Sequence, residues 1–317
     1  RVLSWISLWT LSSLAMAQDT AFQAQVRPTE PLTPAQERDA LRTPPGFEVS
    51  LFAAEPQIRK PMNLAFDTRG RLWVTVTQDY PSPSERPSDA LMILEDTDGD
   101  GTADKVTEFA DGLSIPIGVY PTDDGAIVWS IPNILRLRDT DGDDRADVRE
   151  VLYGPLGEPR DTHGMQNAFR RGPDGWLYIN HGFNNTSRLT GTDGSAIELQ
   201  SGNVYRVRLD GTRVESFTHG QVNPFGSDWD QLGNLYTADC HSRPIYQLIP
   251  GAYYPSFGKP HDGLGFGPEI MRHSHGSTAI SGLVIYQDTL WPEPFHNNAF
   301  VGNVMTSRVN RDQLVFE

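Results

Sequence analysis

Two stretches of the sequence repeat one another: residues 96–104 read Asp-Thr-Asp-Gly-Asp-Gly-Thr-Ala-Asp, and residues 139–147 read Asp-Thr-Asp-Gly-Asp-Asp-Arg-Ala-Asp. They lie 43 residues apart, counted from Asp96 to Asp139. A period of roughly 40 to 50 residues is typical of propellers, in which each repeat forms one sheet. The flanking segments are short apolar runs that indicate strands, not the helices of an EF-hand. The pair therefore predicts loops at the tips of two hairpins.

The same loops carry the residue types of a calcium site. Oxygens at alternate positions of a tight turn converge on one point, and calcium takes about six to eight of them. The candidate ligands are Asp96, Asp98, Asp100, the carbonyl of Thr102 and Asp104 in the first loop, and Asp139, Asp141, Asp143, the carbonyl of Arg145, Asp147 and Glu150 in the second. Aspartate and glycine are also ordinary turn residues, so a hydrated turn without metal remains the alternative.

A second repeat consists of an apolar strand, a turn that ends in glycine, and another strand. The marker glycines are Gly70, Gly125, Gly175 and Gly233, separated by 55, 50 and 58 residues, and a degenerate fifth copy begins at Ser281. Loops of unequal length between similar sheets give such spacing. We expect an all-β fold: a β-propeller over residues 44–317 with about five blades, six in the intact protein, and a truncated C-terminal end.

The N-terminal region has the pattern of an export signal. Arg1 is followed by an uncharged stretch to Ala17, which ends in small residues, and the missing initiator methionine suggests a fragment. Residues 18–43, rich in Pro, Thr and Gln, are expected to form a tether. No segment is apolar enough to predict a transmembrane span. We therefore expect an exported protein, in the periplasm or associated with the cell envelope.

Composition excludes some partners and chemistry. Without residues 1–17 the chain has 25 basic and 41 acidic residues, which gives a net charge near −16. Nucleic-acid binding needs a basic surface, so nucleic acid is not an expected partner. The single cysteine, Cys240, allows no internal disulfide and no C-x-x-C-H haem attachment site in this sequence.

Blade geometry sorts the polar loops into two faces. The near face receives the residues just before each inner strand and just after each second strand, and the far face receives the acidic loops. The near face then collects residues 161–166, 219–223 and 273–277 before inner strands, and residues 78–80, 181–185 and 239–243 after second strands. Most of the eight histidines fall in these segments. We expect a polar site there, and a structural role for the calcium ions.

Several stretches resemble one family closely: residues 44–56 (Pro-Pro-Gly-Phe-Glu-Val-Ser-Leu-Phe-Ala-Ala-Glu-Pro), 161–178, 223–226 (Asn-Pro-Phe-Gly), 239–246, 254–266 and 273–282. The chain from about residue 44 to 317 is similar to the propeller of the membrane-bound dehydrogenases, exported bacterial proteins related to the soluble quinoprotein glucose and sorbosone dehydrogenases. The resemblance implies a sugar or other alcohol as substrate and pyrroloquinoline quinone as cofactor. It also implies a haem c domain or cytochrome as electron acceptor.

The resemblance also implies roles for individual residues. His163 corresponds to the histidine that removes the substrate hydroxyl proton in the quinoprotein dehydrogenases. Asn223 corresponds to the second member of an Arg-Asn pair, but Val222 replaces the arginine. His241, Arg243 and His275 are expected around substrate and cofactor, with Lys259 and Arg272 as further cations for the quinone carboxylates.

Two other functions remain open. The polar near face could be the recognition surface of a non-catalytic propeller that binds carbohydrate or protein. A calcium-dependent hydrolase of the lactonase type is less favoured, because its metal must lie in the channel whereas the acidic loops belong to the far face. Fold alone does not decide between such functions.

Overall fold

The computed structural model describes residues 30–157, 159–257, 266–271, 273–276 and 279–316. The predicted signal segment, part of the predicted tether, Lys259 and Arg272 lie outside these residues. The chain divides into two compact units, Arg1–Leu51 and Phe52–Glu317. The first contains helix α2 (Pro34–Ala40), which begins with a capping box because the Thr33 and Gln36 side chains each bind the other residue's backbone N–H. No helix in the described residues has the length and apolar character needed to cross a membrane.

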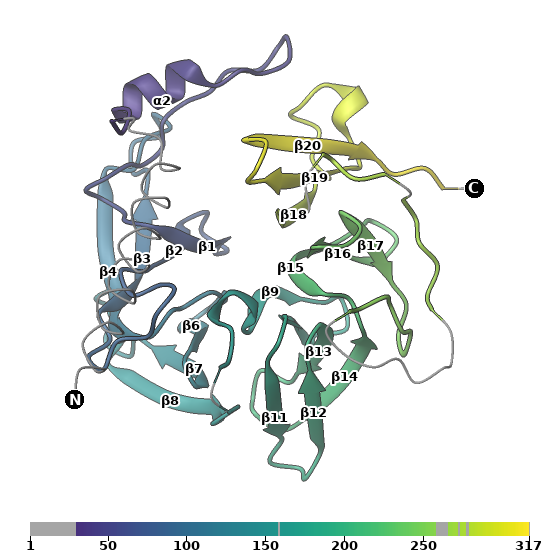
Figure 1. The fold of residues 1–317 in the computed structure, drawn as a ribbon. Coiled ribbons are helices and arrows are strands. Elements are labelled where there is room, and N and C mark those ends of the chain that lie inside the picture. The colour runs from purple at the N-terminus through teal and green to yellow at the C-terminus, as the bar shows by residue number, and fades with distance from the viewer. Residues whose placement is uncertain (1–29, 158, 258–265, 272, 277–278, 317) are drawn as a thin grey trace, which may run out of the picture. The chain divides into compact units, whose positions relative to one another are not determined.

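The second unit is an all-β propeller arrangement of five blades, as the sequence predicts (Figure 1). Blade 1 contains β1 (Pro61–Phe66), β2 (Leu72–Val76), β3 (Asp89–Glu95) and β4 (Lys105–Leu113); blade 2 contains β5 (Val119–Thr122), β6 (Gly125–Ser130), β7 (Asn133–Arg138) and β8 (Val148–Tyr153); blade 3 contains β9 (Asn167–Arg171), β10 (Leu177–His181), β13 (Asn203–Val207) and β14 (Val214–His219). Blade 4 contains β15 (Asn223–Trp229), β16 (Leu235–Cys240) and β17 (Ile245–Leu248), and blade 5 contains β18 (Ile280–Ile285), β19 (Asn298–Asn303) and β20 (Arg308–Gln313).

Three short elements complete the description. The hairpin β11 (Thr186–Thr190) and β12 (Ala196–Gln200) is inserted between the second and third strands of blade 3. Two 3-10 turns, η1 (Thr162–Gly164) and η2 (Glu293–Phe295), precede β9 and β19. All paired strands within the blades are antiparallel, so each blade is a meander.

Apolar side chains hold each pair of neighbouring blades together. Trp73 and Val119 belong to one buried cluster that joins blades 1 and 2, and Trp129 and Leu177 belong to the cluster that joins blades 2 and 3. Similar clusters join blades 3 and 4 and blades 4 and 5. Fully burying one large apolar side chain stabilises a fold by about 1.5–3 kcal/mol, so these contacts supply the main cohesion between sheets.

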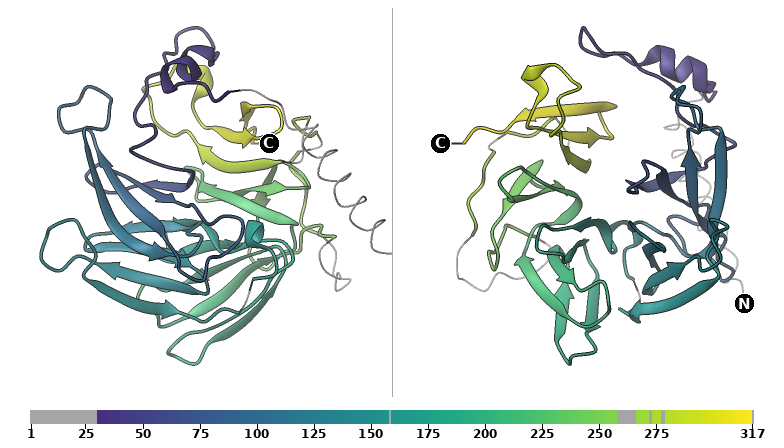
Figure 2. Two further views of the ribbon diagram at one scale, coloured as in Figure 1. Left: turned by 60° about the vertical axis from the view of Figure 1, so that its left-hand side comes forward. Right: turned by 180° about the vertical axis from the view of Figure 1, so that it is seen from behind.

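Strand register places the loops on two faces. The turns after the inner strands and the loops between the third and fourth strands of blades 1 and 2 share the far face, as predicted, and the acidic loops of these two blades project to the same side (left view of Figure 2). An ion pair of 2.7 Å between Arg71 Nη1 and Asp144 Oδ1 links the blade 1 turn to the blade 2 loop. Between the faces, β1, β9, β15 and β18 line a central cavity of about 660 Å³.

Candidate functional site

The near face presents an exposed histidine held by a carboxylate. Asp161 caps η1 by accepting the backbone N–H of His163, and its Oδ1 also lies 2.8 Å from His163 Nδ1. The imidazole is 60% exposed and the Asp161 side chain 26% exposed. Because Asp161 accepts a hydrogen from Nδ1, it favours the tautomer in which Nε2 carries a lone pair. His163 is thus oriented as a proton acceptor.

Blade 1 contributes a tyrosine beside His163, and a lysine that binds the backbone of this tyrosine. The Tyr80 ring meets the imidazole edge-on, with ring centroids 5.2 Å apart. Burial, reinforced by the charge of Asp161, raises the pKa of Tyr80, so its hydroxyl stays protonated. Lys60 Nζ donates to the carbonyl oxygens of Gln78 and Tyr80 at 3.3 and 3.1 Å. Lys60 was not among the residues predicted from the sequence, although its position directly before β1 is the one that predicts a near-face residue.

Blade 3 and blade 4 meet at Asn223, which the sequence analysis placed at the cofactor. Asn223 is buried, and its Oδ1 accepts the backbone N–H of Phe183 at 3.0 Å. Gly182 permits this approach, because a Cβ there would collide with the Asn223 side chain. Val222 is only 2% exposed, so this position faces the protein interior, not the near-face solvent. An arginine at position 222 would therefore need rearrangement of its surroundings.

A buried carboxylate supports this segment. Asp239 is fully buried; its Oδ1 accepts the Asn223 N–H at 2.6 Å, its Oδ2 accepts the Val222 N–H at 3.0 Å, and Ser242 Oγ donates to Oδ2. Burial raises the pKa of Asp239 to about 7, although the three donors act in the opposite direction. Asp239 therefore joins the residues before β15 to those after β16.

The other predicted near-face residues have different environments. His181 is buried, with its ring nitrogens bound to Ser201 O at 2.6 Å and Ser187 Oγ at 3.0 Å, which is a structural role. His241 is exposed and has a left-handed backbone, with φ of 82°. Arg243 pairs with Glu269 at 3.2 Å. His275 binds Asp312 of β20, a residue that the sequence analysis did not single out.

Each acidic loop brings three of its predicted ligands together. Carboxylate oxygens of Asp96, Asp98 and Asp104, and likewise of Asp139, Asp141 and Asp147, all lie within 4.8 Å of one another in their respective loops. Repulsion from Asp143, followed by burial, raises the pKa of Asp141. This clustering of like charge is the arrangement that a cation would relieve.

The remaining predicted ligands lie outside the two clusters. Asp100 and Asp143 accept backbone N–H groups two residues further along their loops, at 2.8 and 2.9 Å. Glu150 lies in β8 and pairs with Arg138 at 3.1 Å, because the regular strand directs its side chain across the sheet. No contact that assigns a ligand role to the Thr102 or Arg145 carbonyl is found among the residues that the structure describes.

Calcium removal should lower the melting temperature if the loops bind metal. At about 100 times its dissociation constant, a ligand stabilises the fold by about 2.7 kcal/mol per site. Asp98→Ala combined with Asp141→Ala should abolish the response to chelator in calorimetry, whereas Asp123→Ala, an exposed far-face aspartate outside both loops, should leave it unchanged. Identical melting of the wild type with calcium and with chelator would contradict this prediction.

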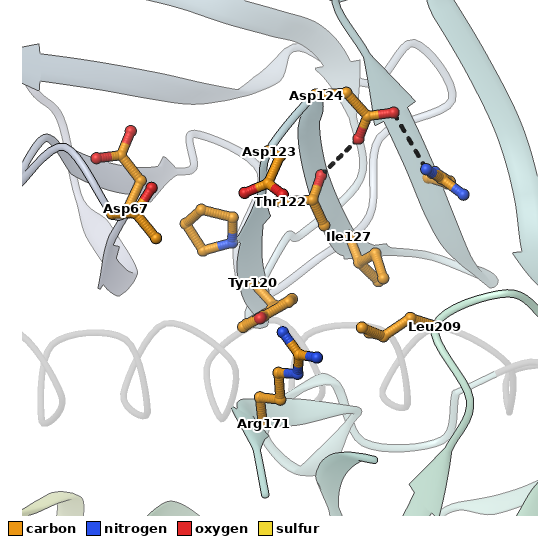
Figure 3. Close-up of a pocket in the computed structure, with 11 residues that line it drawn as sticks. Asp67, Tyr120, Thr122, Asp123, Asp124, Ile127, Arg171 and Leu209 are labelled. Carbon is orange, nitrogen blue, oxygen red and sulfur yellow. Dashed lines mark hydrogen bonds and ion pairs between the residues drawn. The ribbon is translucent and has the colours of Figure 1, made fainter. Parts of the chain in front are cut away.

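A different cavity lies on the far face. It measures about 490 Å³ and is lined by 11 residues that include Asp67, Asp123, Asp124, Arg136 and Arg171 (Figure 3). Asp124 accepts from Thr122 Oγ1 at 3.0 Å and pairs with Arg136 at 3.1 Å. None of the sequence-predicted site residues lines it. We place the candidate site on the near face because the oriented imidazole and the lysine ammonium lie there.

Comparison with known families identifies the group of proteins to which the sequence is related. The model of a family described as a domain of unknown function, DUF7133, matches residues 33–317. The chain belongs to this family. The description names no activity, so membership in the membrane-bound dehydrogenase family stays a prediction. A search of curated proteins finds no match.

Solved structures share the fold of this family member at low sequence identity. The PQQ-bound form of an aldose sugar dehydrogenase from Streptomyces coelicolor is 16% identical, with a TM-score of 0.56, and the match covers 81% of this chain and 78% of the other. An oxidoreductase described as a glucose dehydrogenase, from Thermus thermophilus, is also 16% identical, with a TM-score of 0.52 and coverage of 82% and 80%. At this identity the likeness shows the propeller fold alone.

Proposed function

We propose that the chain is a dehydrogenase that oxidises a sugar or other alcohol on the near face of the propeller, with pyrroloquinoline quinone as cofactor. The observation that carries the proposal is the exposed His163 imidazole, bound to Asp161 through Nδ1 and adjacent to Tyr80. The dehydrogenase folds of the two solved structures support it, since one of them is described as PQQ-bound.

His163 acts as the general base in this proposal. Asp161 holds Nδ1 and stabilises the imidazolium that forms when Nε2 takes the hydroxyl proton of the substrate. The edge-on Tyr80 ring restricts the orientation of the imidazole from the blade 1 side. Such a positioned base typically contributes a factor of about 10²–10⁴ to the rate.

The described residues fit the quinone in part. Its carboxylates need cations, and the near face offers Lys60, while Arg243 is already paired with Glu269. Val222 cannot supply the charge that the corresponding arginine supplies in the resembled enzymes. We infer that Lys60 holds a carboxylate, and the predicted cofactor contacts of Asn223 and His241 remain part of the proposal. When bound, the quinone would supply the acceptor for the hydride of the alcohol carbon.

Lys60 gives a direct test of cofactor binding. Lys60→Met keeps most of the aliphatic side chain but removes the ammonium, and a hydrogen bond to a charged group is worth about 1.5–3 kcal/mol, so quinone affinity should fall roughly tenfold to a hundredfold. Lys60→Arg keeps the charge and should retain most of the affinity. Fluorescence titration with quinone measures both variants. Equal affinity in the wild type and Lys60→Met would remove Lys60 from the cofactor site.

Export and electron transfer complete the proposal. The pattern of residues 1–17 supports an exported protein in the periplasm or cell envelope, where a haem c domain or a cytochrome would take the electrons. Dye-linked oxidation of a panel of sugars and alcohols, after incubation with quinone and calcium, tests the activity. Sugar binding by calorimetry without turnover in this assay would favour the non-catalytic binding propeller instead.

A further inference from the structure

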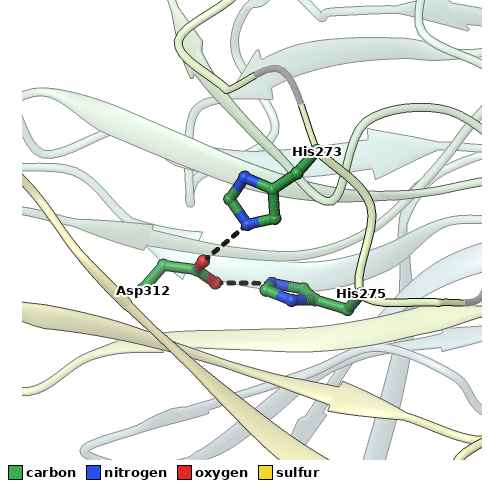
Figure 4. Close-up of side chains that lie close together, drawn as sticks. All are labelled: His273, His275 and Asp312. Atoms are coloured by element: carbon green, nitrogen blue, oxygen red, sulfur yellow. Dashed lines mark hydrogen bonds and ion pairs between the residues drawn. The ribbon is translucent and has the colours of Figure 1, made fainter.

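Three metal-binding side chains come together in blade 5. His275 Nε2 lies 2.8 Å from Asp312 Oδ2, and His273 Nε2 lies 3.5 Å from the other carboxylate oxygen, Oδ1 (Figure 4). The two imidazole rings meet edge-on, with centroids 5.1 Å apart. One ligand atom from each of the three residues lies within 4.8 Å of the other two. The two histidines thus face one carboxylate from two sides.

The surroundings of this trio indicate a built site. The side chains of His275 and Asp312 are only 10% and 12% exposed, whereas His273 is 61% exposed. Asn303 Nδ2 donates to the His275 carbonyl at 3.0 Å and thereby anchors the backbone of that segment. His273 and Asp312 also line a cavity of about 340 Å³ together with Ile245 and Met271.

No cation in the described contacts competes for Asp312. The neighbouring Arg311 also lines the cavity, but its guanidinium is bound elsewhere: Nη1 donates to the Pro294 carbonyl at 3.3 Å, and the group stacks on Phe295 at 4.5 Å. Successive side chains of a strand point to opposite faces, which explains this separation. Among these neighbours, only the two imidazoles therefore contact the Asp312 carboxylate.

We propose that His273, His275 and Asp312 bind a divalent first-row transition-metal ion, with zinc as the preferred occupant. Two imidazoles and one carboxylate suit such ions, whereas calcium requires a shell of oxygens. Ligands about 2.0–2.2 Å from a tetrahedral ion lie roughly 3.3–3.6 Å apart. The distance of 3.5 Å between His273 Nε2 and Asp312 Oδ1 matches this spacing. The shorter His275–Asp312 contact opens by roughly 0.6 Å to admit the ion.

The ion would have two consequences. It would crosslink two parts of blade 5: the segment that precedes β18, and β20, the third strand of the blade. The exposure of His273 leaves one coordination position to water or to a ligand in the adjoining cavity, as in zinc sites with three protein ligands. This site is independent of His163 and of the two acidic loops, so its failure would leave the proposed function untouched.

Zinc titration of the untagged full chain, with calcium in excess to occupy the acidic loops, tests the proposal. We expect one equivalent of zinc to bind, and His273→Ala and Asp312→Asn each to weaken binding at least tenfold by calorimetry. Cobalt should give visible absorption bands that the same variants abolish. His273 is exposed, so His273→Ala should fold even if Asp312→Asn does not, which circular dichroism checks. His241→Ala, which removes another exposed histidine, should bind zinc normally.

Three results would overturn the proposal. No zinc binding to the wild type would leave the trio as a hydrogen-bonded structural cluster. Binding that persists unchanged in both His273→Ala and Asp312→Asn would place the ion elsewhere in the chain. Loss of binding in His241→Ala alone would assign the ion to a site around His241 instead.

Discussion

His163→Ala is expected to lower the turnover of a sugar or alcohol substrate by about 10²- to 10⁴-fold, the usual contribution of a positioned general base. The side chain is 60% exposed and its described contacts are with Asp161 and Tyr80, so the melting temperature should change little. Dye-linked oxidation by protein loaded with quinone and calcium measures the effect. Free imidazole should restore part of the activity, because the exposed position leaves room for it.

Asp161→Asn distinguishes the role of Asp161 in holding the imidazole from the role of His163 in removing the proton. The amide keeps the size of the carboxylate but loses the charge that stabilises the imidazolium, so the pH at which activity rises should shift and turnover should fall less than in His163→Ala. Full activity of His163→Ala without added imidazole would show that another group takes the proton. Rescue by imidazole of a variant with unchanged melting would exclude a purely structural role.

Asp239→Asn should change the pH dependence of stability strongly. Burial raises the pKa of Asp239 to about 7 in the folded protein, well above the unfolded value of about 3.9. A carboxyl group with a raised folded pKa costs nothing below the unfolded pKa and destabilises the fold increasingly as pH rises toward the folded pKa. The cost at and above pH 7 is on the order of 4 kcal/mol, since each pKa unit corresponds to about 1.4 kcal/mol.

The asparagine variant mimics the protonated carboxyl group. Its Oδ1 can accept the Asn223 N–H, and its amide can donate to Ser242 Oγ, which can act as an acceptor. Chemical denaturation at several pH values should show that the stability of the variant relative to the wild type rises between about pH 4 and pH 7. A constant difference over this range would mean that Asp239 titrates as it does in the unfolded chain.

The quantity to follow is the difference in the free energy of unfolding between Asp239→Asn and the wild type, because other carboxylates change stability with pH in the opposite direction. Backbone donors hold the pKa of Asp96 below its usual range, and Arg71 does the same for Asp144. Such groups contribute stability above their unfolded pKa and lose it on acidification. Their effect cancels when wild type and Asp239→Asn are compared at the same pH.

The fold was predictable because its signals are local. The marker glycines and the alternating apolar runs define blades from neighbouring residues, and the acidic loops were correctly predicted as hairpin tips. The near-face position of Lys60 was equally predictable from its place before β1. The residues around it in the sequence form no motif that would single it out. Which aspartates of a loop converge depends on turn geometry, which is why Asp100, Asp143 and Glu150 lie outside the clusters.

Long-range partners were not predictable from the sequence. Asp312 lies 37 residues from His275, inside a strand whose pattern gives no indication of a ligand. Val222 is buried, and its backbone N–H is bound by Asp239 of the next strand. Both facts follow from how two segments pack, and a linear pattern does not contain that information.

The central claim is that the near face binds quinone and reduces it with a sugar or alcohol. Anaerobic titration of the full chain with pyrroloquinoline quinone, followed by addition of substrate to the same sample, tests it most directly. We predict a saturable change in the quinone absorption spectrum, and then its conversion to the reduced form in the wild type but much more slowly in His163→Ala. No binding, or binding without reduction by any sugar or alcohol in the panel, would contradict the claim.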